Sequence, residues 1–170
     1  MGLPIHHFVA STNANNIVPQ YLASGKFEPR ASLATISNAM DVGNPSNFPR
    51  MTEVFENEFD AVRSHISGAS YTDEQTRAAM AEVHKKTGYL LDPHGAVAYL
   101  GLRDYLRHQN QNAVGVFLAT AHPSKFIDVV EETLQTKLEV PQRLAELANK
   151  PTLATPLGTD FAGFKQFLMA

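Results

Sequence analysis

Apolar positions along this chain alternate between strand-like runs and helix-like spacing, and this order predicts an α/β fold. The run "HHFVAS" at residues 6–11 is short, apolar and followed by polar residues, which is typical of a buried strand that leads into a helix. The strongest strand candidate is "NAVGVFLAT" at 112–120, and a weaker one is "RASLATIS" at 30–37. Because helical segments separate the three candidates, we expect a mostly parallel sheet covered by helices.

The clearest predicted helix lies in "SYTDEQTRAAMAEVHKKTG", residues 70–88. Thr72 and Gln75 have the spacing of a capping box, and Gly88 follows two lysines as a stop signal. Further helices are expected at residues 13–26, 49–66, 92–109, 122–135, 141–149 and 159–170.

Three strands make a thin parallel sheet, since such sheets are normally larger and covered on both faces. Either further strands escape the pattern, or the chain forms a piece of a larger sheet. A length of 170 residues is enough for one domain with a core, and no change of composition marks a boundary. We therefore expect residues 1–170 to form a single α/β portion.

Composition excludes several classes of partner. The net charge is -3 and the sequence pI about 6.1, so a basic face for nucleic acid or a membrane surface is not expected. Cysteine is absent, which excludes disulfides and thiolate metal sites. The first residues lack a basic segment followed by a long apolar run, and no stretch reaches the roughly 18 apolar residues of a membrane span. A cytoplasmic protein is expected.

Polar residues follow each predicted strand, where open α/β sheets bind their ligands. They are residues 11–13, the loop at residues 37–47, and residues 119–122. Serine, threonine and asparagine after a strand are also ordinary helix caps, so each of these ends alone has a structural interpretation. The three together favour a small polar ligand.

Other kinds of chemistry have weaker support. A metal site would use His94 and His122 with Asp41 or Asp92, but no paired histidine spacing supports it, and we expect no metal. Phosphate-loop, dinucleotide and Gly-x-Ser-x-Gly motifs are absent. Lys125 could attract an anion, although the sequence favours an ordinary solvated lysine.

Four motifs in order resemble the C-terminal part of the threonine synthase family. They are "STNANNIVPQYL", "TISNAMDVGNPSNFPR", "TGYLLDPHGAVA" and "LATAHPSKF", and "DFAGFKQFLMA" resembles the family's C-terminus. The resemblance implies the tryptophan-synthase-β-like fold and the cofactor pyridoxal 5'-phosphate. It also implies a lyase of threonine biosynthesis that converts O-phospho-L-homoserine and water to L-threonine and phosphate.

The resemblance also assigns roles to residues of this chain. The hydroxyl of Thr120 would meet the pyridine nitrogen of the cofactor, and Val42, Gly43 and Asn44 would pass along its ring. Around these residues it implies a supporting set without an assigned chemical step. That set is Asn13, Asn15, His94 and His122.

Two family features have no counterpart in the chain: the lysine that carries the cofactor and the glycine-rich loop that holds its phosphate. We therefore interpret residues 1–170 as a C-terminal fragment whose partner is the N-terminal part of the same enzyme. The fragment alone is expected to be inactive, and its exposed sheet could cause self-association. The alternative is a complete, non-catalytic module of the same fold that binds a small molecule or regulates.

Overall fold

The computed structural model describes residues 3–109, 113–147 and 150–170, in two compact units at residues 1–138 and 139–170. The first unit contains a two-stranded parallel sheet of β1 (Phe8–Thr12) and β2 (Ile66–Ser70). Phe8 lies opposite Ile66 and Thr12 opposite Ser70, so the two carboxyl ends meet at one edge. The single portion expected over the whole chain stays a prediction.

Helices make the connection that parallel strands require and also cover the sheet. Between the strands lie α1 (Ile17–Ser24), the 3-10 turn η1 (Asn38–Met40), α2 (Phe48–Val54) and α3 (Phe59–His65). After β2 come α4 (Asp73–Thr87), α5 (Pro93–Arg107), the 3-10 turn η2 (Pro123–Phe126) and α6 (Ile127–Leu134).

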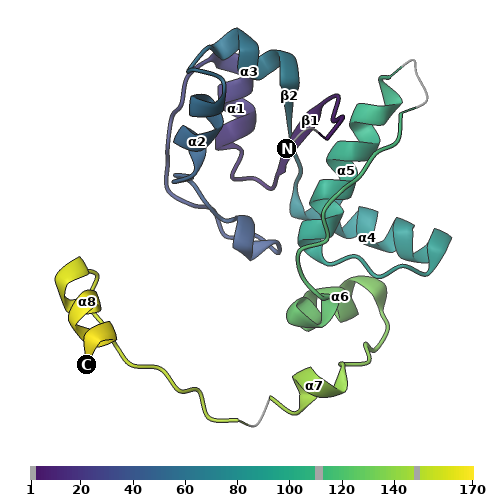
Figure 1. The fold of residues 1–170 in the computed structure, drawn as a ribbon. Helices are drawn as coiled ribbons and strands as arrows, with labels where there is room; N and C mark the ends of the chain where they lie inside the picture. The colour runs from purple at the N-terminus through teal and green to yellow at the C-terminus, as the bar shows by residue number, and fades with distance from the viewer. Residues whose placement is uncertain (1–2, 110–112, 148–149) are drawn as a thin grey trace. The chain divides into compact units, whose positions relative to one another are not determined.

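The two faces of the sheet are covered by different helices, as Figure 1 shows for α1 and α5. On one face Tyr21 and Leu22 of α1 pack with Ala10 and Ile66. On the other face α5 approaches β1 at Gly101, where an added Cβ would lie 1.7 Å from Ser11 Oγ. The expected α/β class, a partial parallel sheet covered by helices, is confirmed.

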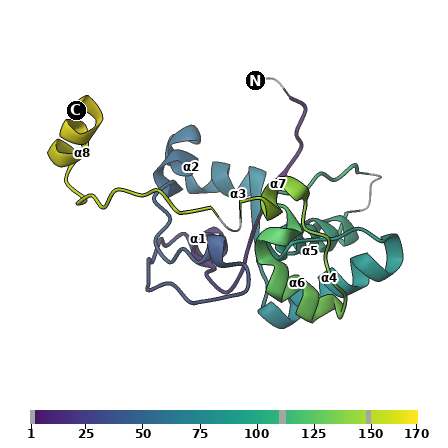
Figure 2. The same ribbon diagram turned by 90° about the horizontal axis from the view of Figure 1, so that it is seen from below.

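The larger core lies among α4, α5 and α6, which are grouped together in Figure 2. Met80, Val97 and Val130 bring one fully buried side chain from each helix. Helix α4 begins at the predicted capping box, in which Thr72 accepts from the backbone N–H of Gln75 and the Gln75 side chain accepts from the backbone N–H of Thr72. This box supplies partners for N–H groups at the helix start.

The strand expected at 112–120 is wrong for residues 113–120, which are extended but pair with no strand in the described part of the chain. Residue 112 lies outside the described residues. The alternating side chains of Val114, Val116 and Leu118 are 97%, 79% and 74% exposed. A strand exists only with a hydrogen-bonded neighbour, and this part of the structure supplies none.

The strand expected at 30–37 is also wrong, because side chains rather than a neighbouring strand bind its backbone. The N–H of Leu33 donates to Asn15 Oδ1, and the N–H of Thr35 donates to Asp41 Oδ2. The helix expected at 49–66 is split, since Glu56 and Asn57 have left-handed backbone angles. Its last residue instead begins β2, which the sequence pattern did not predict.

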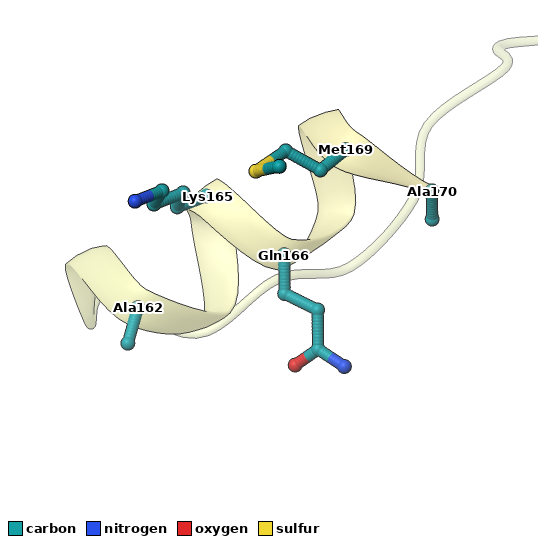
Figure 3. A pocket seen from close by; sticks show the side chains of 5 residues that line it. All are labelled: Ala162, Lys165, Gln166, Met169 and Ala170. Carbon is teal, nitrogen blue, oxygen red and sulfur yellow. The ribbon is translucent and has the colours of Figure 1, made fainter.

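The second unit contains α7 (Gln142–Ala145) and α8 (Phe161–Met169). A shallow pocket on α8 is lined by Ala162, Lys165, Gln166, Met169 and Ala170 (Figure 3). Helix α8 and the residue that follows it supply the whole lining, so this pocket does not enclose a ligand. Among the residues that the structure describes, no helix is long and apolar enough to cross a membrane.

Candidate functional site

The candidate site lies at the carboxyl ends of β1 and β2, where the sequence places polar residues. The backbone N–H of Tyr71 donates to the carbonyl of Thr12, so the chain leaves both strands at the same place. Residues 33–47, which we call the polar loop, return to this edge and are fastened there by side chains. Such fastening offsets the entropy cost of ordering an irregular loop.

Asn13, directly after β1, is the first fastening point. Its Nδ2 lies 2.8 Å from Thr35 Oγ1, 3.0 Å from Ser37 Oγ and 2.9 Å from Asp41 Oδ1. An amide NH2 group carries only two hydrogens, so these three acceptors share them. Asn13 is 1% exposed and Ser37 is fully buried, so water does not compete for the bond between them, whereas Thr35 and Asp41 are half-buried.

Asn15 takes the place of a neighbouring strand for the polar loop. Its Oδ1 accepts from the N–H of Leu33 at 2.8 Å, and its Nδ2 donates to the carbonyl of Leu33 at 2.9 Å. The same Nδ2 also lies 2.9 Å from Asn13 Oδ1. The backbone of Leu33 is therefore paired in both directions without belonging to a sheet.

The carboxylate of Asp41 accepts hydrogen bonds from several residues of this network. Its Oδ1 accepts from Asn13, from Asn15 at 3.1 Å and from Thr35 Oγ1 at 2.7 Å. Its Oδ2 accepts from the backbone N–H of Thr35 at 2.9 Å. A carboxylate, which only accepts hydrogen bonds, suits this half-buried position beside several donors.

His94 ties the polar loop to α5. Asp92 caps this helix, accepting from the N–H groups of His94 and Gly95. The His94 ring is 5% exposed; its Nδ1 lies 2.9 Å from Asp92 Oδ2, and its Nε2 lies 3.1 Å from the backbone nitrogen of Ala39. The same ring packs at a centroid distance of 4.7 Å from Phe126 in η2.

The predicted ring-contacting residues lie at the bend that follows Asp41. Gly43 is buried, and an added Cβ there would lie 2.0 Å from the carbonyl oxygen of Arg30. Its N–H donates to Ser32 Oγ and its carbonyl accepts from the N–H of Arg30. Val42, which is 44% exposed, and the exposed Asn44 flank it and can meet a ligand.

Thr120 and His122 stand just before η2, and both are exposed. Thr120 does not end a strand, contrary to our expectation, but lies at the end of the extended stretch described above. His122 caps η2: its Nδ1 accepts from the backbone N–H of Ser124 and lies 2.7 Å from Ser124 Oγ. Between them, Ala121 packs against the same core as Met40 of the polar loop. The two predicted ligand-contacting segments thus rest on one core.

The sequence analysis missed the residues that hold the polar loop. Thr35 and Ser37 are the clearest examples, because only the folded chain shows which side chains meet Asn13. A run of hydroxyl and amide residues with one acid was the signal that could have found them. Asp41 and Asp92, considered above as metal ligands, are occupied as hydrogen-bond acceptors. In the described ranges no group of three metal-ligating side chains comes together.

Comparisons with known proteins agree with this architecture. A family model described as "Threonine synthase, C-terminal" matches residues 95–168. Threonine synthase of Escherichia coli (strain K12) is 43% identical over 99% of the chain. This chain is similar to the C-terminal region of threonine synthases. It spans only 38% of the length of the Escherichia coli threonine synthase.

Solved threonine synthase structures extend the match to three dimensions. The crystal structure of the Escherichia coli threonine synthase aligns with 99% of the chain at a TM-score of 0.82 and 42% identity, covering 38% of that protein. The threonine synthase of Brucella melitensis, described as PLP bound, aligns over 99% of the chain at a TM-score of 0.77 and 31% identity, covering 41% of that protein. The family resemblance carried by the four sequence motifs is confirmed.

Proposed function

We propose that this chain supplies one wall of the cofactor site of a pyridoxal-phosphate-dependent threonine synthase. The intact enzyme would be a carbon–oxygen lyase that converts O-phospho-L-homoserine and water to L-threonine and phosphate. The observation that carries the proposal is the hydrogen-bond network between the buried Asn13 and the half-buried Asp41, which holds the polar loop and leaves Val42 and Asn44 exposed beside it. Threonine synthases aligned over 99% of the chain support the same role.

The residues present fit the cofactor in three respects. At Gly43 the absence of a Cβ lets the backbone of Arg30 pack directly against the bend, which fixes the position of the neighbouring Val42 and Asn44. Val42 offers an exposed apolar side chain, and Asn44 an exposed amide. Thr120 offers an exposed hydroxyl on a segment that shares its supporting core with the polar loop.

When bound, pyridoxal phosphate supplies the electron sink for elimination and replacement at the substrate, and the protein tunes that chemistry. The hydroxyl of Thr120 would hydrogen-bond the pyridine nitrogen. A neutral hydroxyl does not hold a proton on that nitrogen as a carboxylate would, which favours elimination. The polar loop would orient the ring and exclude water from one of its sides.

The remaining parts of the site must come from outside these residues. The lysine that carries the cofactor and the glycine-rich phosphate loop of the family have no counterpart here. The proposed partner is accordingly the N-terminal part of threonine synthase, and residues 1–170 alone should be inactive. The exposed Val114, Val116 and Leu118 would be covered in that assembly or by self-association. A cytoplasmic location stays a prediction from the sequence.

Reconstitution from two polypeptides tests this proposal. The chain is co-expressed with an N-terminal threonine synthase portion, taken for example from the Escherichia coli enzyme. Phosphate release from O-phospho-L-homoserine is then measured with pyridoxal phosphate present. Activity in the mixture and in neither part alone is the expected result. No activity in a mixture shown to be folded and associated would contradict the proposal and favour the non-catalytic module.

A further inference from the structure

We infer that His94 is a positioning residue that sets the spacing between the polar loop and the Thr120 segment. This inference rests on the proposed function, because these two segments are the proposed contacts of the cofactor. His94 touches both sides: its Nε2 binds the backbone of Ala39 in the polar loop, and its ring packs on Phe126 in η2, six residues after Thr120. It would act on the cofactor only through these neighbours.

The hydrogen bonds determine which ring nitrogen of His94 carries the proton. The backbone N–H of Ala39 can only donate, so Nε2 must be the accepting, unprotonated nitrogen. Nδ1 then carries the hydrogen and donates to Asp92 Oδ2. Asp92 also accepts two backbone N–H groups of α5, so the helix start fixes the orientation of the carboxylate and thereby of the ring.

The contact between His94 and Ala39 lies in the middle of the polar loop, where it can affect the position of the residues on both sides. Ala39 lies in η1, the single turn between the network of Asn13 with Ser37 on one side and the bend at Gly43 on the other. None of the three residues of η1 is buried. The hydrogen bond to His94 therefore restrains this turn at Ala39, next to the partly buried contact of Met40 with the core.

Two substitutions separate the two nitrogens of the ring. His94→Gln places an amide oxygen close to the former Nε2 position, so the Ala39 N–H keeps an acceptor. His94→Asn places its amide close to the Nδ1 position, so it can donate to Asp92 but cannot reach Ala39. A residue that merely fills the core would give a different pattern, because the larger cavity left by Asn would also accelerate exchange around Phe126 and in α5, whereas loss of the Nε2 contact acts on the polar loop.

Hydrogen exchange of the backbone amides in residues 38–44 provides the readout on the chain itself. We expect His94→Asn to accelerate exchange of the Ala39 amide about 5-fold or more, the loss of one ordinary hydrogen bond, with smaller increases up to Gly43. His94→Gln should stay within about 2-fold of the wild type. Equal rates in all three proteins, or equal acceleration in both variants, would overturn the inference.

A measurement on the unaltered protein covers the case in which a variant fails to fold. Long-range proton–nitrogen NMR correlations at neutral pH identify which nitrogen of His94 is protonated. We expect a protonated Nδ1 and an unprotonated Nε2. A protonated Nε2 would overturn the inference, since the Ala39 contact could not then exist.

In the reconstituted enzyme, a positioning role predicts that His94→Asn lowers kcat by about 10-fold or more while His94→Gln restores most of it. The exchange and NMR results depend only on this chain. If they hold while reconstitution gives no activity, the proposed function fails and the role of His94 in holding the loop stands. If they fail in an active enzyme, the inference alone is overturned.

Discussion

The Nδ2 amide of Asn13 lies 2.9 Å from Oδ1 of Asp41, so the end of β1 is hydrogen-bonded to the middle of the polar loop. This contact explains how a long loop of polar residues can be ordered. Its stability comes largely from side-chain hydrogen bonds centred on the buried Asn13 rather than from pairing in a sheet. Buried networks of this kind are specific, and they are also sensitive to the loss of one member.

Asp41→Asn should destabilise the chain by about 1–3 kcal/mol, because an amide NH2 would face the donors of Asn13, Asn15 or Thr35 and leave them unpaired. Urea unfolding followed by circular dichroism measures the change. The exposed Asp60 is the matched control, and Asp60→Asn should change the free energy of unfolding by less than about 0.5 kcal/mol. Equal effects of the two substitutions would show that the network does not hold the loop.

Gly43→Ala should cost at least about 1–3 kcal/mol of stability, because the new Cβ would lie 2.0 Å from the backbone oxygen of Arg30 and a backbone cannot turn aside as a side chain can. Thermal unfolding of the variant is compared with that of Gly158→Ala. At Gly158 the nearest atom to an added Cβ is 3.7 Å away, so that variant should unfold like the wild type. An unchanged Gly43→Ala protein would mean that the two backbone segments are further apart than described.

Acid should weaken the fold through His7. Burial, with the neighbouring charges of His6 and His65, lowers the pKa of His7 below its usual 6.5. The unfolded chain then binds the proton more readily, so stability falls as the pH drops below 6.5 and levels off below the depressed pKa. His7→Gln should flatten this part of a curve of unfolding free energy against pH, whereas replacing the exposed His108 should leave the slope as it is.

Tyr71 should stabilise the chain through Asp104. Its hydroxyl donates to Asp104 Oδ2 at 3.0 Å, and although burial opposes it, hydrogen bonds from Tyr71 and Arg103 hold the pKa of Asp104 below 3.8. Tyr71→Phe should cost about 1 kcal/mol at neutral pH. The difference should shrink as the pH falls below 3.8, because the unfolded carboxyl gains its proton first and the folded one follows at lower pH.

The same pair should make the fold sensitive to alkali. Burial and the hydrogen bond to Asp104 raise the pKa of Tyr71 above 10.0. Stability from this tyrosine is therefore complete below pH 10.0 and is lost as the pH rises beyond it, because the unfolded chain ionises first. Tyr89, which is 51% exposed, is the matched control. The account would be contradicted if Tyr89→Phe changed the loss of stability above pH 10.0 as much as Tyr71→Phe does.

Local signals in the sequence predicted the elements that depend on local chemistry. The capping box of Thr72 and Gln75 begins α4 where expected, and Gly25 ends α1 in a left-handed conformation. The position of the candidate site at polar residues after β1 also followed from the sequence. These features depend on neighbours within a few residues, which a pattern can show.

Strands were harder to predict because they depend on a distant partner. Residues 113–120 have the alternation of a strand but no neighbour in the described chain, and residues 66–70 form β2 with little apolar content because β1 lies alongside. The network of the polar loop was hidden for the same reason. Asp41 and Asn13 are 28 residues apart, and the fold brings them together.

The central claim, that the Thr120 segment and the polar loop face one cofactor, is tested most directly by replacing the Thr120 hydroxyl in the reconstituted enzyme. Thr120→Ser keeps the hydroxyl and Thr120→Val keeps the shape, and the measurement is kcat together with the absorption spectrum of bound pyridoxal phosphate. The account predicts that Thr120→Val shifts the spectrum and lowers kcat by about 10-fold or more, while Thr120→Ser stays close to the wild type. A Thr120→Val enzyme with an unchanged spectrum and kcat would contradict it.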